Sequence, residues 1–342
     1  VPTKVEAPHG KIFPQSDRAR DVLAALQAEL AEQGVVVQLN TPIASLATSE
    51  DRVVGAVTPT GGTIGADAVI VCVGGLSFPK SGSTGDGYKM ARDVGHRVAE
   101  TFPSLVPLRV AGTADLSGVA LRGVEGSVRV DGKTAGPAFR GDVLFTHFGL
   151  SGPVILQLSR AASDGLRRGG AAEIRIDLFP GLSVAQLDSR WIERLANAPR
   201  AHLSTLLQAD LPRSAAGAFL AAAGVPGDRV SSELSRSERL RIVETLRAWR
   251  FPVAGWHSME AAEVTSGGVD VREVDPRTFA SRLVRGLYWA GEVLDVDGYV
   301  GGFNLQAAWS SGWVAGRAAA AYTRELASSR TSSASSAAKE DR

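Results

Sequence analysis

The stretch GLYWAGEVLDVDGYVGGFNLQAAWSSG, residues 286–312, combines a carboxylate, several glycines and an amide. A strand-like run ends in small residues, Glu292 follows, and a glycine-rich loop leads into helical spacing near Asn304. The first amides of a helix lack intrahelical acceptors and carry partial positive charge, so this edge suits a ligand that gathers negative charge. In a flavoprotein such an edge faces flavin N1/O2, and the carboxylate accepts hydrogens from ribityl hydroxyls.

An ordinary strand–turn–helix, in which the glycines only relieve crowding, is the alternative for this stretch. A lone glycine loop favours that alternative, whereas the carboxylate, the glycines and the amide together favour a cofactor site. The residues that we assign to the cofactor here are Gly291, Glu292, Asp297, Gly298, Gly301, Gly302, Asn304 and Leu305.

A second stretch, VIVCVGGLSFPKSGSTGDGYKMARDVGH, spans residues 69–96. The apolar run over 68–73 indicates a strand buried on both faces, and open α/β sheets bind ligands at the carboxyl edge of such strands. A short helix is predicted over 86–95, for which Asp86 would also serve as the N-cap. The candidate residues beside the flavin and ribityl groups are Gly74, Gly75, Thr84, Gly85 and Asp86.

The middle of the chain supplies the candidates for contact with a substrate. His147, in LFTHFGLSGP, and Thr265, in the TSGG loop at 265–268, are the catalytic candidates. The alternative is a partly buried structural His147 with Ser151 capping the following helix. Cys72 is expected to be a small buried hydrophobe. Since the five histidines share no ligand spacing, we expect no metal site.

The periodicity along the chain predicts how these motifs are positioned. Helical spacing begins near residue 16 and a strand follows at 35–40, so residues 1–106 form the first part of one domain. Strand patterns fill 107–182 and 251–275, with a helical insert over 183–250. Residues 276–326 return to the first domain, and the low-complexity tail 327–342 is predicted to be disordered. The fold class is α/β, or α+β overall.

The composition of the chain excludes several classes of partner and of chemistry. The 37 basic and 36 acidic residues imply no basic surface for phosphate backbones or anionic lipids, so we expect a small-molecule substrate and no nucleic-acid or membrane partner. A single cysteine excludes an internal disulfide framework and a CxxC pair, so redox chemistry would require a bound cofactor. The absence of a long apolar run and of a secretory pattern in the sequence predicts a cytoplasmic protein. The oligomeric state stays open.

These motifs resemble those of a bacterial flavoprotein family of NAD(P)/FAD-dependent oxidoreductases that includes aminoacetone oxidase and a bile-acid-reducing flavoprotein. HGKIFPQSDRA, LFTHFGLSGP and AEVTSGGV follow in the family's order, and the resemblance extends from residue 9 to about residue 323. The TGDG and GE motifs are more distantly similar to the flavoprotein subunits of fumarate reductase and succinate dehydrogenase. The resemblance implies a Rossmann-like FAD-binding domain built from both chain ends and interrupted by an antiparallel β domain.

The resemblance also implies FAD as cofactor, NAD(P)H as a possible electron donor, and Ile43 near the adenine through its backbone. Amine oxidation and the reduction of activated double bonds are both open. The family's GxGxxG segment is missing from the sequence, so we expect a truncated chain that holds FAD poorly. The alternative from another class is a flavin-free scaffold without activity.

Overall fold

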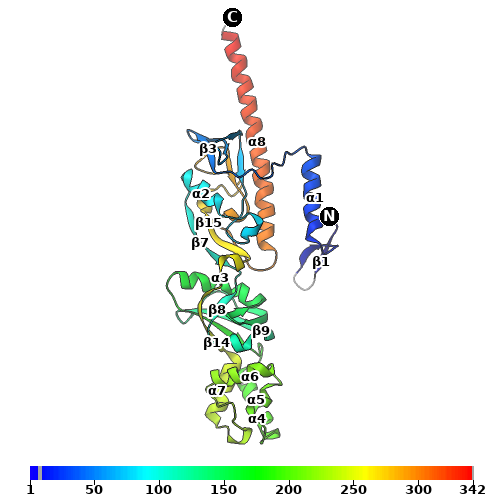
Figure 1. The fold of residues 1–342 in the computed structure, drawn as a ribbon, viewed down its shortest axis with the longest axis vertical. Coiled ribbons are helices and arrows are strands. Elements are labelled where there is room, and N and C mark those ends of the chain that lie inside the picture. The colour runs from blue at the N-terminus through cyan, green and yellow to red at the C-terminus, as the bar shows by residue number, and fades with distance from the viewer. Residues whose placement is uncertain (7–9, 341–342) are drawn as a thin grey trace. The chain divides into compact units, whose positions relative to one another are not determined.

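The computed structural model describes residues 1–6 and 10–340, with side chains described up to residue 330. The chain forms two compact units (Figure 1). The first unit contains Val1–Gly75, Gly85–Ala99 and the chain from Gly267 onward, and the second contains Leu76–Thr84 and Glu100–Ser266. One unit thus draws on both chain ends. The predicted boundaries at 106 and 275 differ from 99 and 266 by seven and nine residues.

Two parallel strands lie at the centre of the first unit. β6 (Val69–Val71) pairs in parallel with β16 (Leu287–Trp289), and all three residues of β16 are buried. A separate antiparallel sheet contains β3 (Ser45–Ser49), β4 (Arg52–Val57) and β5 (Thr63–Gly65). The helices that follow the parallel strands are α2 (Asp86–Asp93) and α8 (Phe303–Glu340). Both motifs predicted to bind the cofactor therefore lie after strands of one parallel pair.

The strand prediction over 68–73 is correct only for its middle. Cys72 and Val73 follow β6 and are exposed, Val73 by 41%, so Cys72 is not the buried hydrophobe expected. Among the described residues, β6 pairs with β16 alone, which leaves its other edge without a ladder partner. The apolar run therefore does not become a strand buried on both faces.

The N-terminal segment consists of β1 (Thr3–Glu6), β2 (Lys11–Pro14) and α1 (Ala19–Glu32). α1 buries none of its residues. The strand predicted at 35–40 is wrong, because residues 35–38 have no regular structure and Val36 is 81% exposed. A strand needs a partner for its amides and carbonyls, and none of the described strands pairs with these residues.

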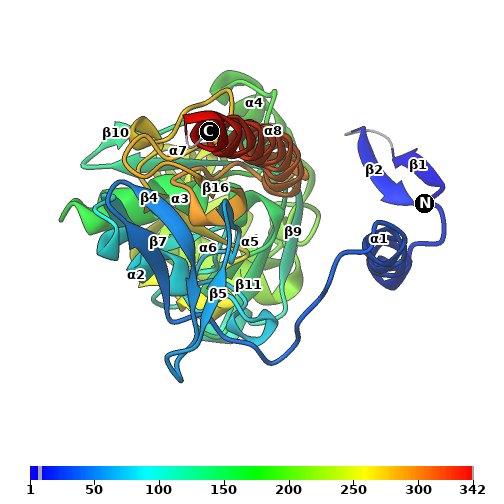
Figure 2. The same ribbon diagram turned by 90° about the horizontal axis from the view of Figure 1, so that it is seen from above.

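The second unit is built on a closed antiparallel ring of six strands, part of which is visible in Figure 2. The order around the ring is β9 (Ala120–Val130), β11 (Phe139–Thr146), β12 (Gly149–Ser151), β8 (Leu108–Val110), β14 (Trp249–Trp256) and β13 (Ala172–Asp177). The pairing of β13 with β9 closes the ring. β10 (Lys133–Thr134) extends β9 as a short hairpin. Buried and less buried residues alternate along β13, as expected for a strand with one face on a core.

Helix α3 (Pro153–Arg167) packs its apolar face against this ring. A Cβ at Gly126 of β9 would lie 2.4 Å from Val154 of α3, so glycine permits the close approach. The N-cap of α3 is Gly152 and no side chain caps it, so Ser151 is the last residue of β12 rather than a cap. LFTHFGLS, which the sequence suggests is a loop, forms the β11–β12 hairpin.

The helical part of the second unit comprises α4 (Val184–Asn197), α5 (Leu203–Leu207), α6 (Arg213–Ala222) and α7 (Arg236–Arg247). Ser183 and Ser235 form capping boxes that fix the starts of α4 and α7. Trp191 and Phe219 are buried in the same apolar core as the strand residue Trp249. These helices share a core with the ring of strands and so belong to one packed unit.

β7 (Val98–Ser104) pairs with β15 (Val264–Val269). At the other end of the chain, α8 continues to Glu340, so residues 327–340 are helical where the composition predicts disorder. Alanine has the highest helix propensity, and extending an existing helix needs no new nucleus. Residues 341–342 lie outside the described part.

Candidate functional site

The ends of β6 and β16 bring the two sequence motifs to one edge. Parallel strands end on the same side of a sheet, so Gly74 and Gly75 after β6 lie beside Gly291 and Glu292 after β16. The Ala290 amide donates to the Val71 carbonyl at 3.0 Å and continues the ladder to this edge. Segments separated by more than two hundred positions therefore meet where the sequence predicts a cofactor.

The TGDG loop packs closely against the segment after β16. Gly85 has φ 82° and is the N-cap of α2, which makes Asp86 the first helical residue and corrects its assignment as the cap. A Cβ at Gly87 would lie 2.8 Å from methyl carbons of both Val293 and Val73. Only glycine lets the first turn of α2 come this close.

The glycine-rich loop is closed by Asn304, the second residue of α8. Its Oδ1 accepts from the Gly298 amide at 2.7 Å, and its Nδ2 donates to the Gly298 carbonyl at 3.0 Å. Gly301 and Gly302 adopt φ of 148° and 87°, and α8 begins at Phe303. The sequence predicts the helix start to within two residues, and the first amides of α8 carry partial positive charge beside this loop.

Ser311 was missed by the sequence analysis. Its hydroxyl accepts from the Gly291 amide at 2.9 Å and donates back to the Ala307 carbonyl at 2.7 Å. This bond ties the turn after β16 to the third turn of α8. A serine in SSG, eight residues into a helix, gives no signal for such a role without the structure.

A cavity of about 180 Å³ lies between the turn after β16 and α8. Its lining is Phe279, Gly291, Glu292, Leu294, Val296, Asn304, Ala307, Ser310 and Ser311. Ligand pockets for whole drug-sized molecules occupy roughly 300–1,000 Å³, so this cavity suits part of a larger ligand. Three of the predicted cofactor residues line it.

Tyr88 provides a further polar group beside Glu292. The side chain is 4% exposed, and among the described residues its hydroxyl has no hydrogen-bond partner. Burial raises the pKa of Tyr88, and the nearby charges of Glu292 and Asp295 raise that pKa further. A buried donor without a partner costs free energy, so a ligand that accepts from it would be stabilised. The hydroxyl, the carboxylate and the α8 amides together fit the polar parts of a flavin nucleotide.

The remaining predicted cofactor residues are placed less closely. Leu305 is 69% exposed in the first turn of α8, and Asp297 lies partly buried in the loop before Gly298. Ile43 lies in an irregular segment before β3 and is partly buried. Thr84 precedes Gly85 in the chain but belongs to the second unit.

Thr265, a catalytic candidate, is fully buried in the second unit. Its Oγ1 accepts from the Leu76 amide at 2.8 Å and from the Ser77 amide at 3.0 Å. Both lone pairs of the hydroxyl are therefore used to hold the chain just after Gly75. This geometry assigns Thr265 the role of an anchor for that loop and leaves no lone pair for a reacting group.

His147, the other candidate, lies exposed at the turn of the β11–β12 hairpin. Its ring packs edge-on against Phe148 at 5.0 Å, and Phe148 packs on His257 with ring centroids 4.2 Å apart. Arg109 of β8 donates to the His257 carbonyl at 3.3 Å. The alternative of a partly buried structural His147 is therefore wrong. The hairpin instead contributes to a surface cluster in which His147 and Arg109 are exposed and Phe148 and His257 are partly buried.

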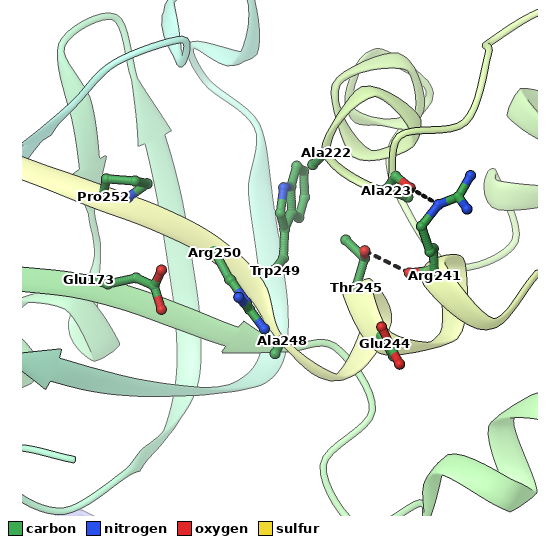
Figure 3. A pocket seen from close by; sticks show the side chains of 10 residues that line it. All are labelled: Glu173, Ala222, Ala223, Arg241, Glu244, Thr245, Ala248, Trp249, Arg250 and Pro252. Carbon is green, nitrogen blue, oxygen red and sulfur yellow. Dashed lines mark hydrogen bonds between the residues drawn. The ribbon is translucent and has the colours of Figure 1, made fainter. Parts of the chain in front are cut away.

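The second unit has a hollow between α7 and the strand β14 (Figure 3). Its volume is about 530 Å³, and its charged lining residues are Glu173, Arg241, Glu244 and Arg250. Arg241 donates to the Ala223 carbonyl at 3.0 Å, so its charge is used at the end of α6. Charges of both signs line this hollow, and no sequence motif marks it.

Among the described residues, no three His, Cys, Asp or Glu side chains lie together in a group that could hold a metal ion. The same residues include no helix long and apolar enough to cross a membrane.

Comparison with known proteins identifies the family. The chain is 31% identical over 311 residues to a 3-dehydro-bile acid delta(4,6)-reductase of Clostridium scindens, covering 91% of this chain and 76% of the relative. It is 32% identical over 310 residues to a ribosomal RNA dihydrouridine synthase of Escherichia coli K12, covering 89% and 72%. A ribosomal RNA dihydrouridine synthase of Haemophilus influenzae is 35% identical over 245 residues, or 72% of this chain and 58% of that protein. The family model described as the HI0933-like protein Rossmann domain matches residues 1–318, which confirms the α/β, Rossmann-like fold class, and the chain belongs to this family.

Proposed function

We propose that this protein is an FAD-dependent reductase that adds hydrogen across a carbon–carbon double bond conjugated to a carbonyl. The observation that carries the proposal is the edge where β6 and β16 end, with the glycine loop and the first turn of α8 beside Glu292. The names of the relatives add the reaction class: one is a delta(4,6)-reductase, and two are dihydrouridine synthases. An enone and a uracil ring share an alkene conjugated to a carbonyl, so one chemistry serves both.

In this proposal, bound FAD would supply the redox chemistry: two electrons from NAD(P)H would reach one carbon of the double bond as hydride, and a proton would complete the other carbon. The residues of the chain bind and orient. The first amides of α8 stabilise negative charge at the pyrimidine edge of the flavin. Glu292 accepts from ribityl hydroxyls, and the buried Tyr88 hydroxyl donates to a cofactor oxygen.

For the substrate, we propose the surface cluster of Arg109, His147, Phe148 and His257. A guanidinium and imidazoles can donate to a carbonyl, and Phe148 offers a ring face for stacking. An imidazole can give up a proton to a reacting carbon, so His147 is the proposed proton donor. Changing His147 to Gln should lower kcat more than it raises KM, whereas Arg109→Ala should mainly raise KM.

The substrate class distinguishes the relatives. The near-neutral net charge predicts a small molecule, whereas two relatives are named for an RNA product. Amine oxidation, the other chemistry that the motifs allow, matches none of the three names. A truncated, flavin-free scaffold has no support from these relatives.

The test is turnover with FAD and NADPH or NADH, using a steroid enone and, in parallel, uridine-containing ribosomal RNA fragments. Loss of the enone absorbance or appearance of dihydrouridine by mass spectrometry would support the proposal and identify the substrate class. If an added amine were oxidised to its imine with oxygen as the electron acceptor, or if neither alkene were reduced by protein that binds FAD, the proposed reaction would be wrong.

A further inference from the structure

His96 is a buried histidine outside the candidate cofactor residues, and it is held on both nitrogens. The residue is 3% exposed, and its Nε2 lies 2.7 Å from Ser281 Oγ and 3.3 Å from Trp289 Nε1. Its Nδ1 lies 3.2 Å from Glu273 Oε2. The ring also packs edge-on against Trp289, with centroids 5.2 Å apart.

The neighbours of His96 determine its tautomer. The indole of Trp289 can only donate, so Nε2 must present a lone pair to it. Ser281 Oγ already accepts from the Leu283 amide at 3.1 Å and the Val284 amide at 2.9 Å, so its own hydrogen points to Nε2. The proton of the neutral ring is then on Nδ1 and is donated to Glu273. A second proton, on Nε2, would face two donors.

Burial favours this same neutral state of His96, and the carboxylate that opposes it, Glu273, is also paired with Arg97. Glu273 accepts from the Arg97 amide at 2.8 Å and from the Arg97 guanidinium at 2.6 Å. Asp270 pairs with Arg272 at 2.7 Å and with Arg97 at 3.2 Å. Burial lowers the pKa of His96. The Glu273 carboxylate raises that pKa in part, but the same carboxylate is also paired with Arg97. Protonation would therefore put a charge into a buried site whose acceptor carboxylate already has a cationic partner.

The position of His96 connects the two cofactor motifs. The His96 amide donates to the Ala91 carbonyl at 2.9 Å and the Gly95 amide to the Arg92 carbonyl at 3.0 Å, which ends α2 in a Schellman motif. Trp289 is the last residue of β16, two positions before Gly291. One side chain thus joins the helix that begins at the TGDG loop to the strand that ends at the GE turn.

We propose that His96 is a positioning residue: its neutral Nδ1–H form fixes α2 against β16, so that acidification loosens both cofactor motifs together. The predicted change in FAD affinity rests on the proposed FAD function. The tautomer of His96 and its role in holding α2 against β16 do not depend on that function. Below the folded pKa of His96, FAD affinity should fall by up to about tenfold per pH unit, the limit for one linked proton.

The test uses the full chain and its variants His96→Gln and His96→Phe. Gln retains an acceptor near the Nε2 position without titrating, and Phe retains the ring against Trp289 without either hydrogen bond. His202→Gln, an exposed histidine of the second unit, is the matched control. Hydrogen exchange measured without cofactor at one pH should be faster in His96→Phe around both residue 86 and residue 291, and unchanged in His202→Gln.

Nitrogen NMR of histidine-labelled protein then reports the tautomer, and FAD titration over pH 5–8 reports the linkage. We expect a neutral Nδ1–H signal that is lost in both His96 variants, and an acid loss of affinity that His96→Gln flattens. An Nε2–H tautomer, or exchange that rises around only one of the two segments, would overturn the positioning role. If FAD affinity depended on pH identically in wild type and His96→Gln, the linkage would be overturned. If the wild type bound no FAD at any pH, the proposed function would be refuted. The exchange and NMR results would still decide the positioning role.

Discussion

The close approach at Gly87 predicts the result of a single methyl addition. A Cβ there would lie 2.8 Å from Val293 and from Val73, at least about 0.6 Å inside ordinary van der Waals contact. Both neighbours are β-branched and stiff at χ1, so they cannot rotate away easily. Overpacking of this kind costs about 1–3 kcal/mol. The gain in helix propensity from glycine to alanine offsets about 1 kcal/mol.

Gly316→Ala is the matched control, since a Cβ at this position in α8 meets nothing within 4 Å. It should stabilise the protein by up to about 1 kcal/mol, so urea unfolding should separate the two variants by about 1–3 kcal/mol, with Gly87→Ala the less stable. Because α2 must shift away from Val293, Gly87→Ala should also weaken FAD binding. The affinity falls about tenfold for each 1.4 kcal/mol of binding free energy that is lost. Equal stability and equal FAD affinity in the two variants would refute the packing argument.

Three further predictions follow from the hydrogen bonds. Thr265→Val should lower the free energy of unfolding in guanidinium by about 1–3 kcal/mol, because one buried and one partly buried amide lose their acceptor, and Thr265→Ser should restore most of it. Equal stability of the Val and Ser variants would exclude the anchor role. Asn304→Ala should weaken FAD binding by opening the loop at Gly298, measured by flavin fluorescence titration, and an unchanged dissociation constant would contradict this. The Arg272 guanidinium lowers the pKa of Asp270 to about 2. The ion pair therefore contributes fully to stability above the ordinary Asp pKa of 3.8, and this contribution is lost as pH falls toward 2. Asp270→Asn should flatten that part of the profile of urea stability against pH, whereas a mutant profile parallel to that of the wild type would show that the pair contributes nothing.

The sequence is sufficient to predict the parts of the fold that carry local signals. The glycines, Glu292 and Asn304 predict the loop and the start of α8, because helix starts and tight turns are set by nearby residues. The parallel alignment of β6 and β16 follows from the expectation of an α/β sheet. The six-stranded ring is not predictable in the same way, since its closing pair, β13 with β9, joins segments with no local sign of pairing.

Other features depend on contacts that a single sequence does not display. Apolar residues at 35–39 predict a strand, yet a strand forms only where a partner accepts its backbone groups. Trp309 and Trp313 suggest packing by their spacing but are 51% and 69% exposed. The roles of Ser311 and Tyr88 come from the approach of distant segments, so neither residue type nor spacing could reveal them.

FAD titration of the purified protein beside its Asn304→Ala and Gly316→Ala variants asks whether the edge formed by β6, β16 and α8 binds a flavin. We expect saturable binding of one FAD per chain, whatever its affinity, that Asn304→Ala weakens and Gly316→Ala leaves unchanged. Absence of saturable binding, or binding that all three proteins share equally, would show that the edge formed by β6, β16 and α8 is not a flavin site.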